Sequence, residues 1–594
     1  MTQAETEAGA PVVPLPPDAS DHVAQLPLQQ WGFDHCPAIP YWADEVGDPD
    51  LAQIENTVAL LKQRAEQGAA AYGGLDIDYT IGGQTLPAYT FLYGESLPLD
   101  DPRQFTLPWT TYEDVYQDSQ DLIGPFAETL TTTQAANDAF WPTIAEFGLP
   151  LNLLVLEKVD TDRFGELTKE FGDAWADDEI RDLVAAGLLY AIDMRILESL
   201  GPFHVPDGSV RFVPATLTLL RQDPTSRALT PVSILVWTKG VPPRNYVSSD
   251  NAWLWALQAA KASITVWGIW LGHVYHWHSV TAAMQMTMHN NLPAGHRLWP
   301  LLRPQSQSLI NFNYALLTLL WGKITPPTPV DGYLSLLELL NKFADKRAFF
   351  DDDPHNELKA RKLDAKDFRK DTDWDAYPVV GYMLEIWKHT HEFVKAVVPA
   401  IYPTDSEVAN DADLQKWLTA TGNSSEGNVK GLKDVQTCAD LEEVLTSLLY
   451  RVNVHGAGSL SPSVNPALAF VANFPPCLQS ADIPEPTEQP DLLEVLPNTR
   501  SIGGMTTFVF TFAYSTPYAS LIPGGGVSLD PWFPPSQQKC NAALATFREQ
   551  IATFVDGYVK EWNEALARIR GGPPSSIPGY ATDQYGQWPS SIEI

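Results

Sequence analysis

The stretch NAWLWALQAAKASITVWGIWLGHVYHWHSVTAAMQMTMHNN, residues 251–291, decides the fold. It runs for about forty residues without proline, and apolar side chains occupy almost every face of the helix that this pattern predicts. A helix that is apolar all round is buried on every side. The sequence therefore predicts a long central helix in a large, mostly helical domain.

A transmembrane helix is the alternative for this stretch, because residues 253–272 are long enough to span a bilayer. However, Gln258, Lys261 and the histidine-rich continuation carry polar groups that are costly in lipid. We therefore expect the core of a helical bundle here and no transmembrane segment.

Histidines are concentrated in the second half of this helix and just after it. Five of the twelve in the chain are His273, His276, His278, His289 and His296. Any one of them alone would be interpreted as a histidine satisfied in the core or at the surface. Their concentration points instead to a shared role, and imidazole is a common metal ligand.

The spacing of two of these histidines requires a distorted helix if they share a metal ion. An α-helix advances about 100° per residue, so His273 and His278 would lie about 140° apart. A local π-helix brings positions five apart onto one face, and such distortions concentrate at functional sites. His273 and His276, three apart, could chelate in a plain α-helix and are the competing assignment.

The remaining sequence adds helices and a minor β-sheet. Two β-branched, apolar runs, VRFVPATLTLL at 210–220 and TPVSILVWTK at 230–239, predict paired strands. Charged residues crowd 341–374, which we expect to be a solvated surface loop with helical pieces. Amphipathic patterns predict helices over 50–70, 134–147, 161–175, 177–200, 376–400, 411–421, 438–455 and 535–570.

Charge and cysteine content narrow the possible functions. The 38 Lys and Arg against 73 Asp and Glu give a formal net charge of −35, which repels phosphate backbones, so no nucleic-acid partner is expected. The four cysteines stand far apart, which argues against a disulfide framework or a zinc knuckle. The acidic start carries no basic or apolar leader pattern and predicts a cytoplasmic protein.

Several blocks of the chain resemble the lipoxygenases, in the same order. The first is the His-x4-His pair on the long helix, followed by LPAGHRLWPLLRP at 292–304. The second contains LTSLLYRVNVHGAGS at 445–459, and the chain ends in WPSSIEI, similar to the terminal Ser-Ile-x-Ile of that family. The resemblance implies an N-terminal extension over 1–50 and one lipoxygenase-like catalytic domain over 51–594, without the β-sandwich domain that many members carry.

The resemblance also implies a set of ligands for one non-haem iron, or manganese. His273 and His278 are the first two ligands, His455 is the third, and the C-terminal carboxylate of Ile594 is a further one. The remaining position, usually His or Asn, is Ser459, whose hydroxyl would bind weakly or through water. Taken alone, His455 would be a core histidine and Ile594 a frayed chain end.

The implied partners are a polyunsaturated fatty acid and O2. Ferric hydroxide would remove hydrogen from a bis-allylic carbon, and O2 would add to give a conjugated-diene hydroperoxide. Glutamines that the family commonly has near the first and third ligands are replaced by Ile269 and Pro462, which implies an unusually apolar pocket. The small residue that tends to set stereochemistry in relatives falls near Tyr314 or Ala315. These departures leave open hydroperoxide isomerase or lyase chemistry, or a catalytically silent lipid-binding homologue.

Overall fold

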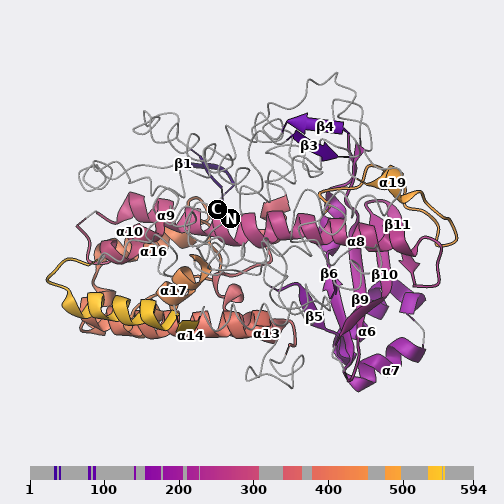
Figure 1. Ribbon diagram of the computed structural model, residues 1–594. Helices are drawn as coiled ribbons and strands as arrows, with labels where there is room; N and C mark the ends of the chain where they lie inside the picture. Colours follow the sequence, from indigo (N-terminus) through magenta and orange to yellow (C-terminus); the bar gives the residue numbers. More distant parts are fainter. Residues whose placement is uncertain are drawn as a thin grey trace, which may run out of the picture.

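The computed structural model describes most of the central part of the chain. The described residues are 32–36, 39–41, 78–81, 84–87, 140–141, 154–175, 178–204, 210–225, 228–293, 295–306, 339–363, 378–452, 475–496, 533–551 and 553–554. They form a mostly helical fold with a small antiparallel sheet, which confirms the predicted fold class. Figure 1 shows the long central helix running from the sheet into a layer of helices.

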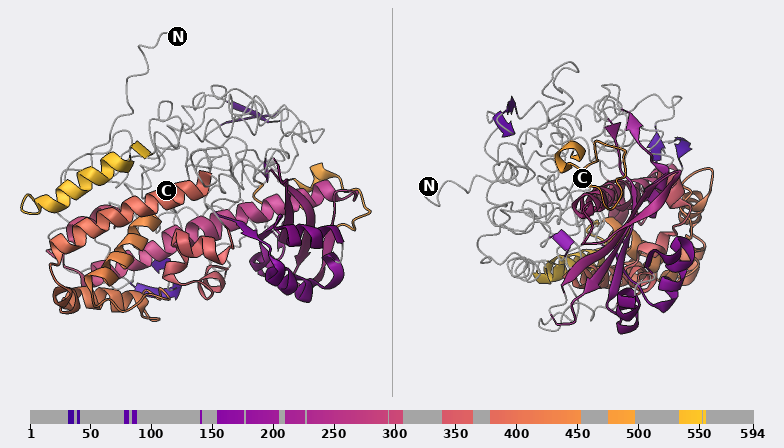
Figure 2. Two further views of the ribbon diagram at one scale, coloured as in Figure 1. Left: turned by 90° about the horizontal axis from the view of Figure 1, so that it is seen from below. Right: turned by 90° about the vertical axis from the view of Figure 1, so that its right-hand side faces the viewer.

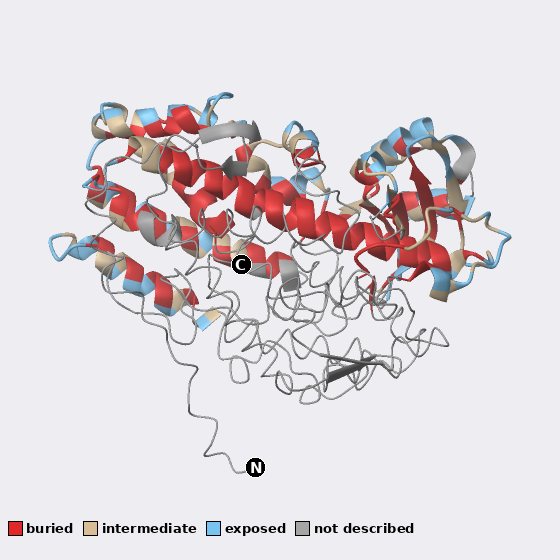
Figure 3. Ribbon diagram, turned by 90° about the horizontal axis from the view of Figure 1, so that it is seen from above, coloured by how far each residue is buried: buried red, intermediate tan, exposed pale blue. Residues whose placement is uncertain are grey.

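The central helix consists of three consecutive parts. α8 (Trp253–Trp267) leads into a π-helical segment, η5 (Gly268–Ser279), and this leads into α9 (Val280–Asn291). Figure 3 shows the helix buried along nearly its whole length. Gln258 and Lys261 are buried with the apolar side chains, as expected for a bundle core. In the part of the chain that the structure describes, no helix is both long and apolar enough to cross a membrane.

The largest sheet has five antiparallel strands in the order β11-β10-β9-β6-β5. The predicted pair is present, with Leu217 opposite Leu235. The strands are β5 (Leu156–Lys158), β6 (Leu189–Asp193), β9 (Ala215–Gln222), β10 (Leu229–Thr238) and β11 (Val241–Tyr246). α8 packs on β9 and β10 at one end of the central helix.

Alternation along β6 divides the core in two, because neighbouring residues of a strand point to opposite faces. Tyr190 and Ile192 belong to the main core, which contains the central helix. Leu189 and Ala191 belong to a smaller core on the other face, which α6 (Thr161–Phe171), η3 (Gly172–Trp175) and α7 (Asp178–Ala186) cover. The predicted helix at 161–175 is therefore confirmed as α6 and η3.

The predicted helix over 177–200 is wrong beyond its first half. α7 ends at Ala186, and Gly187 has a φ of 68°, a left-handed conformation that commonly ends helices. β6 follows, and then a short 3-10 helix, η4 (Arg195–Ser199). The apolar run after Gly187 pairs with β5 and β9, so tertiary pairing outweighs its helical pattern.

Four further predicted helices are present in the helical layer, two of them described only in part. α14 (Pro378–Ile401) packs against α17 (Cys438–Arg451), and α16 (Ala412–Gly422) packs against α9. Residues 538–551 form a helix beside α14, where the rings of Phe393 and Phe547 lie 5.2 Å apart (Figure 2). The predicted helix at 50–70, most of 134–147 and the ends of 438–455 and 535–570 lie outside the described residues.

The charged region 341–374 contains helical pieces, as predicted, but it is not wholly solvated. Its described pieces include the end of a helix at 339–344, η7 (Phe349–Asp352) and α13 (Pro354–Ala360), and both Asp352 and Glu357 are buried. The shorter described elements elsewhere are β1 (Gly32–Cys36), β2 (Ile39–Tyr41), β3 (Asp78–Ile81), β4 (Gln84–Pro87), β7 (Phe203–His204), β8 (Val210–Arg211), α10 (Trp299–Ser306), α15 (Asp405–Ala409) and α19 (Leu492–Val495).

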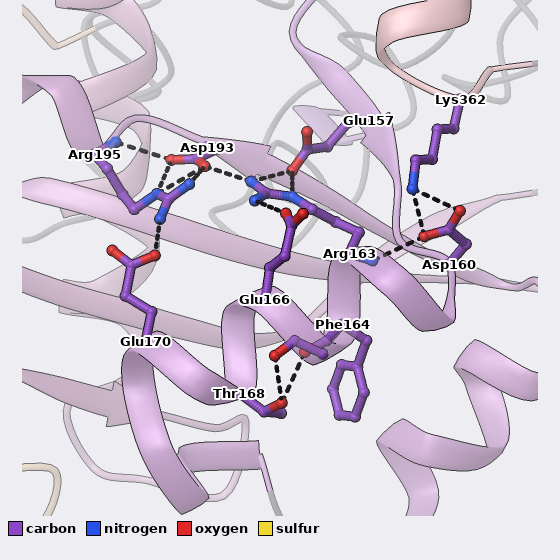
Figure 4. A network of polar contacts seen from close by, with 11 residues as sticks. Glu157, Asp160, Arg163, Phe164, Glu166, Thr168, Glu170, Asp193, Arg195 and Lys362 are labelled. Atoms are coloured by element: carbon purple, nitrogen blue, oxygen red, sulfur yellow. Dashed lines mark hydrogen bonds and ion pairs between the residues drawn. The ribbon is translucent and has the colours of Figure 1, made fainter.

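A network of charged side chains joins α6 to the edge of the sheet, and we call it the sheet-edge network (Figure 4). Arg163 on α6 contacts Glu157 of β5 and Asp193 of β6, with nitrogen–oxygen distances of 2.9 Å to each. Arg195 contacts the same Asp193 at 2.6 Å. These four side chains are partly exposed to solvent.

Candidate metal centre

The π-helical segment brings His273 and His278 together. Their Nε2 atoms lie 3.0 Å apart, and their ring planes are nearly perpendicular, at 83°. The hydroxyl of Ser279 donates to the carbonyl of Val274, five residues earlier, as the wider turn allows. The distortion predicted from the spacing of the two histidines is confirmed.

The geometry of this pair fits two ligands of one metal ion. Two nitrogens that are each about 2.1 Å from an ion and at a right angle to one another are about 3.0 Å apart. Both imidazoles are buried, with exposed fractions of 1% and 4%. A direct hydrogen bond from one ring to the other is the alternative arrangement for two neutral imidazoles, and metal content distinguishes the two.

His276, the competing partner of His273, points to a different group. Its Nδ1 lies 2.9 Å from a carboxylate oxygen of Asp352. Burial lowers the pKa of His276 to about 4, although Asp352 acts in the opposite direction. His276 is therefore neutral near pH 7, and the structure pairs His273 with His278 rather than with His276.

The other two histidines of the cluster have partners that explain them structurally. Nε2 of His296 lies 3.1 Å from Asp411, and its Nδ1 accepts a hydrogen bond from the backbone of Leu298. The ring of His289 is nearly perpendicular to that of Trp299, and the ring centroids lie 5.3 Å apart. For these two, the interpretation as satisfied histidines fits better than a ligand role.

The remaining predicted site residues lie mostly outside the described part of the chain. Ile269 is described and is buried on the π-helical segment. The others are His455, Ser459, Ile594, Pro462, Tyr314 and Ala315. Among the described residues, no group of three or more His, Cys, Asp or Glu side chains could hold a metal ion. The described part thus contains two of the predicted ligands.

Polar contacts beside this pair involve two residues that the sequence analysis missed, Asp352 and Arg451. Nη1 of Arg451 donates to Asp352 at 2.5 Å and to the carbonyl of His276 at 3.0 Å. Nη2 of Arg451 donates to the carbonyl of Phe349 at 2.9 Å. Arg347 contacts the second oxygen of Asp352 at 2.5 Å. We call Asp352, Arg451, Arg347 and His276 the buried cluster.

The charges of the buried cluster determine the state of its carboxylate. Burial alone would raise the pKa of Asp352, but the polar contact with the neutral His276 and the positive charges of Arg451 and Arg347 outweigh it and hold the pKa well below the usual range. Asp352 is therefore ionised, with two guanidinium groups against it. A lone Arg in the apolar run LTSLLYRVNV at 445–454 was the available signal, because buried arginines require a counter-charge.

Comparison with known proteins shows which proteins this region is similar to. Residues 226–500 match the family model for lipoxygenases. The rat polyunsaturated fatty acid lipoxygenase ALOX15B is 25% identical over 313 residues, which cover 51% of this chain and 44% of the rat protein. The human hydroperoxide isomerase ALOXE3 is 27% identical over 240 residues, 39% of this chain and 32% of the human protein. The matches thus span less than half the length of these relatives.

Solved structures of lipoxygenases share the fold. A calcium-dependent 11R-lipoxygenase superimposes with a TM-score of 0.66 at 18% identity, over 96% of this chain and 79% of that one. The lipoxygenase of Fusarium graminearum gives a TM-score of 0.62 at 15% identity, over 91% of this chain and 89% of that one. The resemblance seen in the sequence blocks is confirmed, and the chain has the lipoxygenase fold.

Proposed function

We propose that this chain, which carries a lipoxygenase domain on a lipoxygenase fold, converts a polyunsaturated fatty acid to a conjugated-diene hydroperoxide. The observation that supports this most is the His273–His278 pair on a buried π-helical segment. A π-helix is uncommon, and here it occurs where the two histidines need it to share an ion.

The proposed centre holds one non-haem iron, with manganese as the other candidate. His273, His278, His455 and the C-terminal carboxylate of Ile594 would be its ligands, and Ser459 would contribute weakly or through water. When bound, the metal would supply a one-electron oxidant together with an acidic water that can exchange a proton. Neutral imidazoles suit this role, because a ring nitrogen can bind a metal only when it carries no proton.

The proposed reaction balances without a further reagent. The fatty acid loses one hydrogen atom from a bis-allylic carbon, O2 forms a C–O bond with the resulting radical, and return of a proton and an electron completes the hydroperoxide. Ile269, on the same segment as both histidines, is buried and apolar. Together with Tyr314 and Ala315 it is proposed to exclude water from the acyl chain.

The test is ultraviolet conjugated-diene formation from linoleate in air, on protein with its native C-terminus and known metal content. His278→Ala should reduce bound metal at least about tenfold and abolish diene formation. The matched control is His289→Ala, because His289 belongs to the same cluster but faces Trp299, and it should retain both properties. Diene formation that persists in metal-free protein would contradict the proposal.

The proposed role of the C-terminus has its own test. Extending the chain by a few residues after Ile594 converts its carboxylate to a peptide group, which is a poor metal ligand. Metal content should fall, while an equal extension before Met1 should not change it. Unchanged metal content in the C-terminally extended protein would remove Ile594 from the ligand set.

A second candidate function is isomerisation of fatty-acid hydroperoxides. The similarity to the hydroperoxide isomerase ALOXE3 favours it, as does the replacement of polar residues by Ile269 and Pro462. Anaerobic incubation with a hydroperoxide, followed by a search for epoxyalcohol or lyase products, distinguishes it from dioxygenation. A silent lipid-binding homologue would bind fatty acid with no stoichiometric metal.

The domain division at residue 50, the cytoplasmic location and the absence of nucleic-acid binding stay predictions.

A further inference from the structure

We propose that Asp352 and Arg451 are positioning residues for the candidate metal centre. They bind the π-helical segment to α17 and so hold His273 and His278 in place relative to the chain that continues to His455. The proposal rests on the proposed function for the metal, whereas the link between the two helices can be tested without it.

The guanidinium of Arg451 joins three segments that are far apart in the sequence. It donates to the backbone of the π-helical segment at His276, to the backbone of η7 at Phe349, and to the carboxylate of Asp352. A planar fork with five N–H donors can serve acceptors in several directions at once, and the single ammonium of a lysine cannot reproduce this. The contact therefore sets orientation as well as charge.

Burial makes this link stiff, because water cannot take the place of a missing partner. The side chains of Arg451 and Asp352 are 2% and 6% exposed. A buried charge that loses its partner keeps its full desolvation cost. The three segments are therefore favoured in one relative position, the one that keeps all of these contacts.

The segment that carries Asp352 is itself held by contacts with another part of the chain. The backbone N–H of Phe349 donates to the carbonyl of Lys430 at 2.7 Å. Next to it, Gly431 has a φ of 74°, and a Cβ at this position would lie 2.5 Å from Cβ of Ala348. Only glycine allows this approach. These contacts hold the backbone near Asp352 in place, so Asp352 does not move with Arg451 if α17 shifts.

The link acts on the histidine pair through the residue between them. His276 lies between His273 and His278, and both its carbonyl and its imidazole are held, by Arg451 and by Asp352. On the other side, His455 follows Arg451 by four residues in the sequence. The same two side chains therefore constrain the π-helical segment that carries His273 and His278, and they hold it to the described end of the helix that precedes His455 in the sequence. Groups that orient ligands without touching the metal typically change metal affinity about 10- to 100-fold when mutated.

The experiment uses the full chain with Arg451→Lys and Asp352→Asn, and Arg163→Lys in the sheet-edge network as the matched control. Hydrogen exchange of residues 268–280 is measured in chelator-treated protein, and the rate of metal loss to a chelator is measured in metal-loaded protein. Both buried-cluster variants should exchange faster across 268–280 with no change in β9 or β10, and should lose metal at least about tenfold faster. Arg163→Lys should change neither quantity.

Two results would overturn the proposal. The first is that both buried-cluster variants exchange hydrogen across 268–280, and lose metal, at the same rates as wild type. The second is that Arg163→Lys changes these rates as much as the buried-cluster variants do. If wild-type protein binds no metal, the proposed function fails, yet the exchange of 268–280 still decides whether the link exists. If Arg451→Lys does not fold, Asp352→Asn, which keeps the shape of the side chain, decides alone.

Discussion

The buried cluster and the sheet-edge network contain the same kinds of side chain in opposite surroundings. In the buried cluster the paired Arg451 and Asp352 are 2% and 6% exposed, whereas Arg163 and Asp193 in the sheet-edge network are 17% and 19% exposed. Water can replace a lost partner at the sheet edge but not beside the central helix. An Arg–Asp pair is therefore expected to contribute little to stability at the sheet edge and much more beside the central helix.

The two groups of charges also differ in what they join. Arg163 and Asp193 are 30 residues apart and belong to one small sheet unit. Arg451 lies 99 residues from Asp352 and 175 from His276, so it joins segments that only the tertiary fold brings together. Long-range contacts of this kind fix the relative position of elements. Four single variants and one double variant test how far the two groups differ.

The largest expected effect is that of Arg451→Met. It leaves the carboxylate of Asp352 facing fewer cations in a dry environment, and should lower the free energy of unfolding by about 3–5 kcal/mol in urea titrations. The double variant Arg451→Met with Asp352→Leu should lose less than the single variant, because the stranded charge is gone. Equal losses in the single and double variants would mean that packing of the arginine, not its charge, is what matters.

Asp352→Asn should lower the free energy of unfolding by about 2 kcal/mol at pH 7, because hydrogen bonds to a charged acceptor become hydrogen bonds to a neutral one. The pKa of Asp352 is held well below its unfolded value of about 3.9, so its carboxylate stabilises the fold above that pH. The difference between wild type and variant should stay level from about pH 7 to 5 and shrink as the pH falls below about 4. Unfolding measured across this range checks the sign, and a difference that grows with acidification would contradict it.

Arg163→Met in the sheet-edge network should cost at most about 1 kcal/mol, because its partners are partly solvated. At 1 M salt, where the screening length is about 3 Å, this cost should shrink further. The cost of Arg451→Met should hardly respond to salt. A similar salt response in both variants would show that the two groups of charges do not differ in solvation.

The smallest effect is expected for Glu157→Gln, and its pH dependence has the opposite sign. Burial raises the pKa of Glu157 by more than Arg163 lowers it. A carboxyl with a raised folded pKa takes up a proton on folding, so wild type should lose stability relative to the variant as the pH rises through that pKa. We expect the free energy of unfolding of wild type relative to the variant to change by about a few tenths of a kcal/mol, measured by thermal unfolding between about pH 4 and 7. A pH slope like that of Asp352→Asn would contradict the assignment.

Several features could be predicted from the sequence because they depend on neighbours along the chain. Continuous apolar sequence over 251–291 predicts a helix buried on every side, and the structure confirms it. The spacing of His273 and His278 predicts a π-helical distortion, since two residues five positions apart share a face only in a π-helix. The prediction over 177–200 failed where strand pairing with β5 and β9 outweighed a helical pattern.

By itself, the sequence determined the central helix, its π-helical turn and the resemblance to lipoxygenases, because periodicity, spacing and motif order are local properties. Only the tertiary structure decided that Asp352, one of three consecutive aspartates, is the buried one, and that Arg451 is its partner. Charge patterns mark aspartates as solvated by default. Which one gives up its water depends on whether a distant cation meets it in the folded core, and this is a matter of position in space.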